Sequence, residues 1–203
     1  TAFTMEGSSI KFGPGVTREI GEDLKRLNVK RVLIFIDPNL LKSQTVATVL
    51  EAIKKQNIDA AIFSVIRIEP TDASFKAAIK VATAGKFDGF VAVGGGSTID
   101  TAKAANLYAT YPAEFLEYVN APIGKGTPVP GPLKPLVAVP TTAGTGSETT
   151  GVAIFDLLEQ HVKTGIAHRA LRPVLGIIDP DNTKTLPPLV AACSALDILS
   201  HAI

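Results

Sequence analysis

Short continuous runs of apolar residues alternate with longer amphipathic segments along the first half of the chain. The runs cover residues 32–36, 60–65 and 89–93. Continuous apolar runs of this length are typical of strands that are covered on both faces. Between them, residues 40–55 and 74–85 carry apolar side chains three or four positions apart, as amphipathic helices do. The pattern therefore predicts alternating strands and helices.

The spacing of the apolar runs predicts how these elements connect. Successive runs begin about 30 residues apart, which is the length of a parallel strand–helix–strand unit. Residues 136–139 and 175–178 read as two further strands, and Pro187-Pro188 introduces a helix from about residue 189 to the end. We therefore expect an α/β fold with a doubly wound, Rossmann-like parallel sheet.

The residues between these elements agree with that fold. Asp37-Pro38 ends the first strand, and Thr71 or Asp72 is positioned to cap the helix that begins near residue 74. Residues 122–135 contain five of the chain's 14 prolines and three of its glycines. This composition predicts an irregular surface loop.

Composition narrows the class of partner. The 203 residues are 46% hydrophobic and carry a formal charge of +1, so the chain can form a packed core and has no bulk field that favours nucleic acid or a membrane surface. No apolar run reaches the roughly 18 residues that span a bilayer. The single cysteine, Cys193, excludes an internal disulfide and is expected to be a small packed side chain. Small molecules are the expected partners.

A glycine-rich turn follows the third apolar run and precedes a good helix-forming segment. Glycines let the backbone approach a phosphate closely, and the amides and dipole of a helix N-terminus attract a pyrophosphate. The alternative is an ordinary strand-to-helix turn, since the motif is not the usual G-x-G-x-x-G. The candidate residues are Gly94, Gly95, Gly96 and Ser97.

Two further features lie where parallel strands are expected to end. Asp37 could accept hydrogen bonds from an adenosine ribose, although an Asp before Pro is more often a turn residue. A second glycine loop, residues 140–148, follows the strand at 136–139. It is either a plain Ser/Thr-rich loop or a set of hydroxyls that holds ribose, phosphate or adenine, and the pairing with the first loop favours binding. Its hydroxyl residues are Thr141, Thr142, Thr145 and Ser147.

The last predicted helix carries an acid and a histidine four positions apart. At this spacing Asp197 and His201 share one helix face and could share one Fe²⁺ or Zn²⁺ ion. A helix-surface ion pair is the commoner explanation, and two ligands alone fall short of a metal site. The other histidines, His161 and His168, are expected to be structural.

Three segments taken together resemble the iron-containing, group III alcohol dehydrogenases: GGGSTIDTAKA (94–104), PTTAGTGSE (140–148) and ALDILSHAI (195–203). Within this family the chain is most similar to the hydroxyacid-oxoacid transhydrogenase group. That similarity covers essentially the whole chain and is carried by EPTDASF (69–75), VAVGGGSTIDTAKAANLYA (91–109), APIGKG (121–126) and PLKPLVAVPTTAGTGSETTGVAIFD (132–156).

The resemblance implies an N-terminal portion of a larger enzyme, with an NAD-binding α/β domain at residues 1–185. Residues 186–203 would be the first helix of an all-helical metal-binding domain. Asp197 and His201 match the first two metal ligands of the family, and two further histidines are expected after Ile203. The implied cofactor contacts are Gly94, Gly95, Gly96 and Ser97 on the pyrophosphate, Asp37 near the adenosine ribose, Thr141, Thr142, Thr145 and Ser147 around the adenine and nicotinamide side, and Lys163 near the nicotinamide ribose.

The implied chemistry is hydride transfer through NAD between a hydroxyacid, such as 4-hydroxybutyrate, and an oxoacid, such as 2-oxoglutarate. A divalent metal, Fe²⁺ or else Zn²⁺, acts as Lewis acid. Two alternatives stay open: an NAD-dependent alcohol or polyol dehydrogenase, and a non-catalytic nucleotide-binding module. The resemblance also implies a homo-oligomer, such as a dimer, and a mitochondrial location, with the cytoplasm as the alternative.

Overall fold

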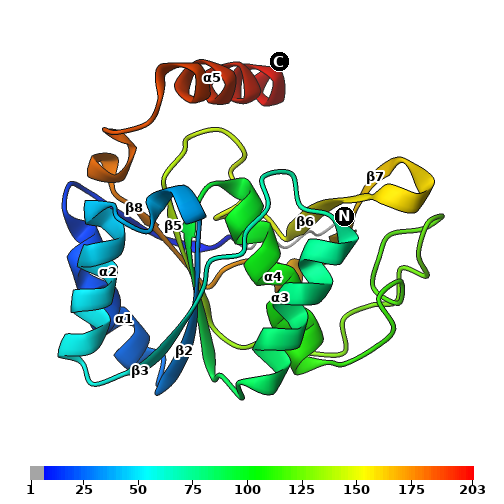
Figure 1. Cartoon of the computed structure of the whole chain (residues 1–203), viewed down its shortest axis with the longest axis horizontal. Coiled ribbons are helices and arrows are strands. Elements are labelled where there is room, and N and C mark those ends of the chain that lie inside the picture. Colours follow the sequence, from blue (N-terminus) through cyan, green and yellow to red (C-terminus); the bar gives the residue numbers. More distant parts are fainter. Residues whose placement is uncertain (1–6) are drawn as a thin grey trace, which may run out of the picture.

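Six parallel strands form the central sheet of the computed structural model, which describes residues 7–203 (Figure 1). The strand order across the sheet is β1-β8-β5-β4-β2-β3. All five predicted strands are present, which confirms the parallel α/β sheet. The strands are β1 (Ser9–Phe12), β2 (Arg31–Ile36), β3 (Asp59–Phe63), β4 (Gly89–Gly94), β5 (Leu136–Pro140) and β8 (Leu175–Ile178).

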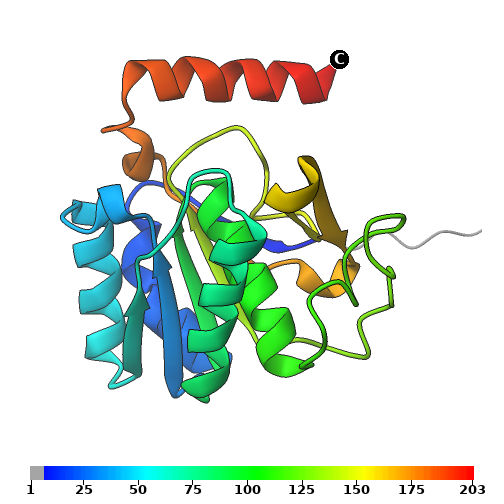
Figure 2. The same cartoon turned by 45° about the vertical axis from the view of Figure 1, so that its right-hand side comes forward.

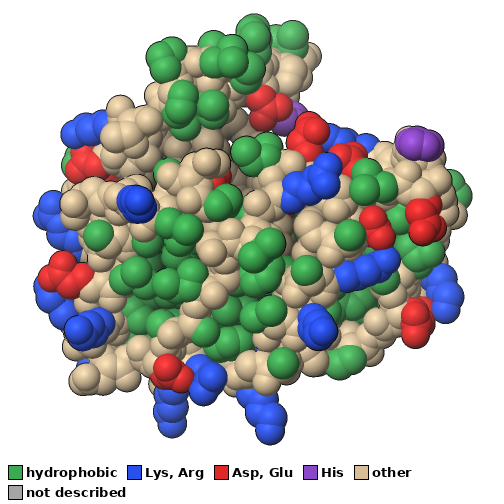
Figure 3. All heavy atoms as spheres, in the orientation of Figure 1, with side chains coloured by type: hydrophobic (Ala, Val, Ile, Leu, Met, Phe, Trp, Pro, Cys, Tyr) green, Lys and Arg blue, Asp and Glu red, His purple; other side chains and the backbone are tan. Residues whose placement is uncertain are grey.

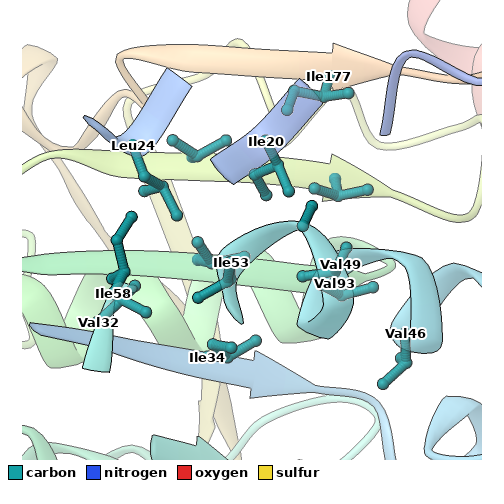
Figure 4. Packing of buried hydrophobic residues seen from close by; sticks show 14 of the residues in the cluster. Ile20, Leu24, Val32, Ile34, Val46, Val49, Ile53, Ile58, Val93 and Ile177 are labelled. Carbon is teal, nitrogen blue, oxygen red and sulfur yellow. The ribbon is translucent and has the colours of Figure 1, made fainter. Parts of the chain in front are cut away.

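Helices cover both faces of this sheet. On one face, α1 (Ile20–Arg26) and α2 (Gln44–Lys55) pack on alternate side chains of the central strands, as Figure 4 shows for Ile20, Ile53 and Ile34. On the other face, α3 (Asp72–Ala84) and α4 (Gly96–Thr110) pack on the intervening side chains, among them Phe35 and Phe90. The continuous apolar runs in the sequence are explained, because both faces of each central strand are buried.

The ends of the helices follow the capping residues in the sequence. The Thr71 hydroxyl accepts the Ser74 amide at 3.2 Å, and the Ser74 hydroxyl accepts the Thr71 amide at 2.9 Å, so the two residues form a capping box at the start of α3. The predicted cap at Thr71 is confirmed. At the end of β2, Asp37 caps a short 3₁₀ turn by accepting the Asn39 amide at 2.8 Å.

A β-hairpin that the sequence analysis did not predict lies beside α4. Its strands are β6 (Val152–Leu157) and β7 (Val162–Ala167), which pair antiparallel. Phe155 and Ile166 are buried against the outer side of α4, together with Tyr118 of the loop that follows α4. The loop itself, residues 111–135, contains no helix or strand, as its prolines and glycines predict.

The last helix, α5 (Pro188–Ala202), runs across the carboxyl ends of the sheet strands (Figure 2). The helix begins where the proline pair predicts, but no residue of α5 is buried. Leu196 is 65% exposed and Ile203 is 97% exposed. The expectation that Cys193 is packed is wrong, since its side chain projects from this uncovered helix. Within residues 7–203 only a short 3₁₀ helix, Pro180–Thr183, and α5 follow the last sheet strand, so the structure does not show an all-helical domain.

A buried carboxylate fastens the start of the chain to the last sheet strand. Asp179, directly after β8, accepts the amides of Gly15 and Thr17 at 2.9 and 3.1 Å and the Thr17 hydroxyl at 2.7 Å. β1 pairs in register with β8 beside this contact. The edge of the sheet is thereby closed by residues from opposite ends of the sequence. No helix in the described part of the chain is both long and apolar enough to cross a bilayer.

Candidate active site

A crevice lies at the carboxyl ends of two neighbouring strands, β2 and β4. The chain leaves these two strands toward opposite faces of the sheet. After β2 the chain passes to α2 on one face, whereas after β4 it passes to α4 on the other. This reversal leaves a gap outside the carboxyl ends of the two strands, where ligands bind in sheets of this kind. Asp37 ends β2 and Gly94 ends β4, and the Asp37 amide donates to the Val93 carbonyl at 3.2 Å.

The first glycine loop has little room for side chains. A Cβ on Gly94 would lie 2.4 Å from the Thr98 hydroxyl oxygen. Gly95 is the N-cap of α4 and supplies no side-chain cap. The Thr98 and Ile99 amides already donate to the Gly95 carbonyl, at 3.1 and 3.2 Å. The Gly96 and Ser97 amides precede these bonds and have no acceptor within the helix, so they are available to an anion. The turn is therefore built to let a phosphate approach the backbone.

The second glycine loop packs directly on the first. A Cβ on Gly95 would lie 3.1 Å from the Thr142 hydroxyl oxygen, and one on Gly96 would lie 2.8 Å from the Thr145 methyl carbon. The Thr141 amide donates to the Gly94 carbonyl at 3.1 Å. From the sequence, these glycines were explained either by phosphate binding or by an ordinary strand-to-helix turn. The structure adds a further reason, which is close contact between the two loops.

A cleft of about 510 Å³ opens between these loops, the hairpin and α5. Figure 3 shows a hollow beneath the uppermost helix, bordered by charged side chains. The cleft brings together six of the residues predicted from the sequence: Gly96, Ser97, Thr145, Lys163, Asp197 and His201. The other lining residues are Glu69, Pro70, Asp100, Ile154, Phe155 and Asp156.

Carboxylates outnumber cations in the cleft lining. Lys163 on β7 is the one lysine among the lining residues, and its Nζ lies 3.6 Å from Glu69 and 4.0 Å from Asp156. The Glu69 amide donates to the Ser97 hydroxyl at 3.2 Å, which holds this loop against the first glycine turn. An anionic ligand therefore finds its positive potential in the α4 N-terminus and Lys163.

Asp197 and His201 face the cleft from α5, with a carboxylate-to-imidazole distance of 3.7 Å. Carboxylate oxygen and imidazole nitrogen suit Fe²⁺ or Zn²⁺, so the pair fits two positions of a metal site. Among residues 7–203 no group of three or more His, Cys, Asp and Glu side chains is arranged to hold a metal ion. The pair is thus compatible with a metal ion but incomplete within the described chain.

The sequence analysis missed two polar residues on α4. Lys103 is fully buried and donates to the Ser147 hydroxyl at 2.7 Å. Asp100 lines the cleft and accepts from the same hydroxyl. Ser147 was predicted to contact the cofactor, and its hydroxyl is engaged inside the protein. An available signal was the occurrence of Asp100 and Lys103 in a helix segment with no other charged residue.

The remaining predicted residues lie around the cleft and do not line it. Asp37 holds the Asn39 amide at the end of β2, one strand from the first loop. Thr141 is buried at the end of β5, and Thr142 contacts Gly95. His168 accepts the Ala170 amide at 3.1 Å, which is a structural role as expected.

The chain is similar to a known family and to several known proteins. The model of the family described as iron-containing alcohol dehydrogenase matches residues 7–180. The chain is 56% identical to hydroxyacid-oxoacid transhydrogenase, mitochondrial, of Bos taurus and 54% identical to that of Homo sapiens, over all of its length and 44% of theirs. The chain therefore spans less than half the length of these relatives.

Solved structures show the same fold. An NADH-dependent butanol dehydrogenase from Thermotoga maritima has a TM-score of 0.90 and 29% identity, with 98% of this chain and 50% of that one covered. A sulfoacetaldehyde reductase from Bifidobacterium kashiwanohense, solved in complex with NAD⁺, has a TM-score of 0.88 and 25% identity, with coverages of 100% and 52%. Both likenesses extend over essentially the whole described chain.

Proposed function

Since the chain belongs to the iron-containing alcohol dehydrogenase family, we propose that it is the NAD-binding part of a metal-dependent oxidoreductase that transfers a hydride between a hydroxyacid and an oxoacid. The observation that carries the proposal is the cleft, which joins a phosphate-binding turn to Asp197 and His201. The substrate class rests on the 53 to 56% identity to hydroxyacid-oxoacid transhydrogenases of animals and of Dictyostelium discoideum.

In this proposal each part of the nucleotide has its own segment of the chain. The amides of Gly96 and Ser97 bind the pyrophosphate because they are the unpaired donors of a helix N-terminus. Asp37 accepts from the adenosine ribose at the end of the neighbouring strand, and Lys163 donates to the nicotinamide ribose from the hairpin. The remaining proposed contacts are Gly94, Gly95, Thr141, Thr142, Thr145 and Ser147.

Asp197 and His201, which line the cleft, would supply two of the ligands of the metal ion, Fe²⁺ or Zn²⁺. When bound, the ion supplies Lewis acidity that stabilises an alkoxide during hydride transfer. We assign residues 1–185 to the nucleotide-binding domain and residues 186–203 to the start of a helical metal-binding domain.

An NAD-dependent alcohol or polyol dehydrogenase is the second candidate. Solved structures named as alcohol dehydrogenases share the fold at 24 to 30% identity, whereas the transhydrogenases share more than half of the residues of this chain. The higher identity favours the transhydrogenase. In that reaction NAD stays bound and is reduced and reoxidised in alternation. The relatives' names print a mitochondrial location, which supports a proposed setting in the mitochondrial matrix. We also propose a homodimer.

The test uses the full-length protein without added nucleotide. The protein is mixed with 4-hydroxybutyrate and 2-oxoglutarate, and 2-hydroxyglutarate is measured by mass spectrometry. Catalytic formation of this product supports the proposal. Stoichiometric NADH release with a simple alcohol, and no 2-hydroxyglutarate, would support the alcohol dehydrogenase instead. Nucleotide binding without turnover of either substrate set would leave only a binding module.

A further inference from the structure

We infer that Lys103 is a positioning residue that sets the shape of the nicotinamide half of the cleft. The inference rests on the proposed function, because it assigns a role within the same site. Lys103 lies on α4 two turns after the first glycine loop and does not line the cleft itself. It therefore acts through the residues it holds.

The Lys103 ammonium is fully buried and hydrogen-bonded to three residues at the end of the second glycine loop and just after it. It donates to the Ser147 hydroxyl at 2.7 Å, to the Val152 carbonyl at 2.8 Å and to the Thr150 hydroxyl at 3.2 Å. An ammonium has three protons to donate, so these partners satisfy it. Lys103 thus fixes residues 147–152 against the side of α4.

Asp100 lies one turn earlier on α4, and its carboxylate is 3.4 Å from the Lys103 ammonium, whose charge it balances. It accepts from the Ser147 hydroxyl with one oxygen and from the Ile154 amide, at 3.0 Å, with the other. The Lys103–Asp100 pair consequently fastens α4 to both the second glycine loop and β6. The segments fixed in this way carry cleft-lining residues.

The held segments form two walls of the cleft. Ser147 donates its amide to the Thr145 hydroxyl at 3.2 Å, and Thr145 contacts the first glycine loop at Gly96. Ile154 lines the cleft, and Asp156 on the same strand pairs with Lys163 across the hairpin. A loss of the Lys103 contacts would therefore displace Thr145 and the hairpin while α4 keeps its own N-terminus.

Stability alone does not explain a charge at this position. Burial lowers the pKa of the Lys103 ammonium below its ordinary value, and the Asp100 carboxylate offsets part of that effect. Replacement of a buried ion pair by packed apolar side chains is often neutral or stabilising. What the charge provides is a fixed geometry, since three donors reach three separate acceptors in directions that a methionine side chain cannot reproduce.

The experiment compares NADH and ADP binding in the full-length protein and its variants. In the proposed binding mode ADP would occupy the first loop and leave the nicotinamide half of the cleft empty, so the two ligands would separate the two regions. For Lys103→Met we expect the NADH dissociation constant to rise at least about tenfold, and the ADP constant to change less than about threefold. Asn106→Leu is the matched control, because Asn106 is also buried on α4 but donates to the Lys134 carbonyl, away from the cleft.

We expect Asn106→Leu to lower the melting temperature and to leave both dissociation constants unchanged. If Lys103→Met weakened the binding of NADH and ADP equally, or weakened neither, the inference would be overturned. If Lys103→Met does not fold, Thr150→Val removes a single bond to the ammonium, and an unchanged NADH affinity in that variant would also overturn it. Failure of the unsubstituted protein to bind NADH would instead reject the proposed function, and the inference with it.

Discussion

Single residues set how closely α5 approaches the second glycine loop. A Cβ on Gly144 would lie 3.1 Å from the Asp197 carboxylate and 3.2 Å from the Ser194 carbonyl. Both distances are shorter than ordinary van der Waals contacts. The absence of a side chain at Gly144 therefore permits Asp197 to lie at the edge of the cleft.

Gly144→Ala is expected to weaken metal binding by displacing this carboxylate. We expect the dissociation constant for Zn²⁺ in the full-length protein to rise about tenfold, which corresponds to about 1.4 kcal/mol. Isothermal titration calorimetry measures the change. Gly7→Ala is the control, because no atom lies within 4 Å of the added methyl group. Equal affinities in the two variants would contradict the prediction.

A second residue-scale prediction concerns Asp179. Burial alone would raise the pKa of its carboxyl group, but hydrogen bonds from Thr17, Gly15 and Asp181 outweigh burial and hold the pKa below its ordinary value. A depressed pKa means that the folded protein binds the proton less tightly than the unfolded chain. The stabilisation is therefore complete above the unfolded pKa of about 3.9 and is lost as the pH falls through the folded pKa.

Asp179→Asn should accordingly lower the melting temperature at pH 7, and the difference from the unsubstituted protein should narrow below about pH 4. Thermal unfolding followed by circular dichroism at several pH values provides the measurement. Asp59→Asn, at an exposed ion pair with Arg31, should leave the melting temperature nearly unchanged. If Asp179→Asn lowered the melting temperature by the same amount at every pH, the carboxylate charge would not be the cause of the stabilisation.

At the level of elements, the central strands and their helices were predictable because both faces of each strand are buried. Periodicity alone separates such runs from the amphipathic helices between them. The edge strand β1 is mostly exposed, so its four residues carry no continuous apolar signal. The β6–β7 hairpin interrupts the strand–helix alternation, and residues of β7 such as Lys163 and Thr164 are polar. Its place beside α4 is a tertiary contact that periodicity does not encode.

Truncation of a side chain should lower the free energy of unfolding by different amounts in different helices. Ile53 on α2 is buried in the core, whereas Leu199 on α5 is 53% exposed. Ile53→Ala is expected to lower the free energy of unfolding by about 2 to 5 kcal/mol, and Leu199→Ala by less than about 0.5 kcal/mol. Urea denaturation of the 203-residue chain measures both. A large loss of unfolding free energy for Leu199→Ala would mean that α5 packs on the domain more tightly than the exposure of Leu199 indicates.

At the scale of the whole molecule, the candidate site was predictable in its residue types but not in its internal contacts. The two glycine loops follow adjacent parallel strands, so topology alone brings them to one edge of the sheet. The Lys103–Ser147 bond joins positions 44 residues apart, and no spacing rule indicates it. The metal assignment of Asp197 and His201 depended on resemblance, because two residues on one helix turn do not specify a ligand.

The separation of loops and α5 across the cleft leads to a further prediction. Asp197→Ala and His201→Ala in the full-length protein should abolish the proposed hydride transfer but change the NADH dissociation constant less than about threefold, because the proposed phosphate site at the α4 N-terminus lies across the cleft from α5. Product formation and NADH fluorescence titration measure the two effects. If both variants lost NADH binding as well as turnover, α5 would have to be part of the nucleotide site.

The closure of the sheet by β1 and β8 bears on how the chain acquires its structure during synthesis. The Gly15 and Asp179 groups that meet at this edge are 164 positions apart. A ribosome therefore releases the first strand long before its neighbour has been translated. Meanwhile β2, β3 and β4, which are close in sequence, can already associate. The strand that becomes β1 thus stays without its partner β8 while the residues between the two are translated, and a chaperone that shields such an edge would act on this segment.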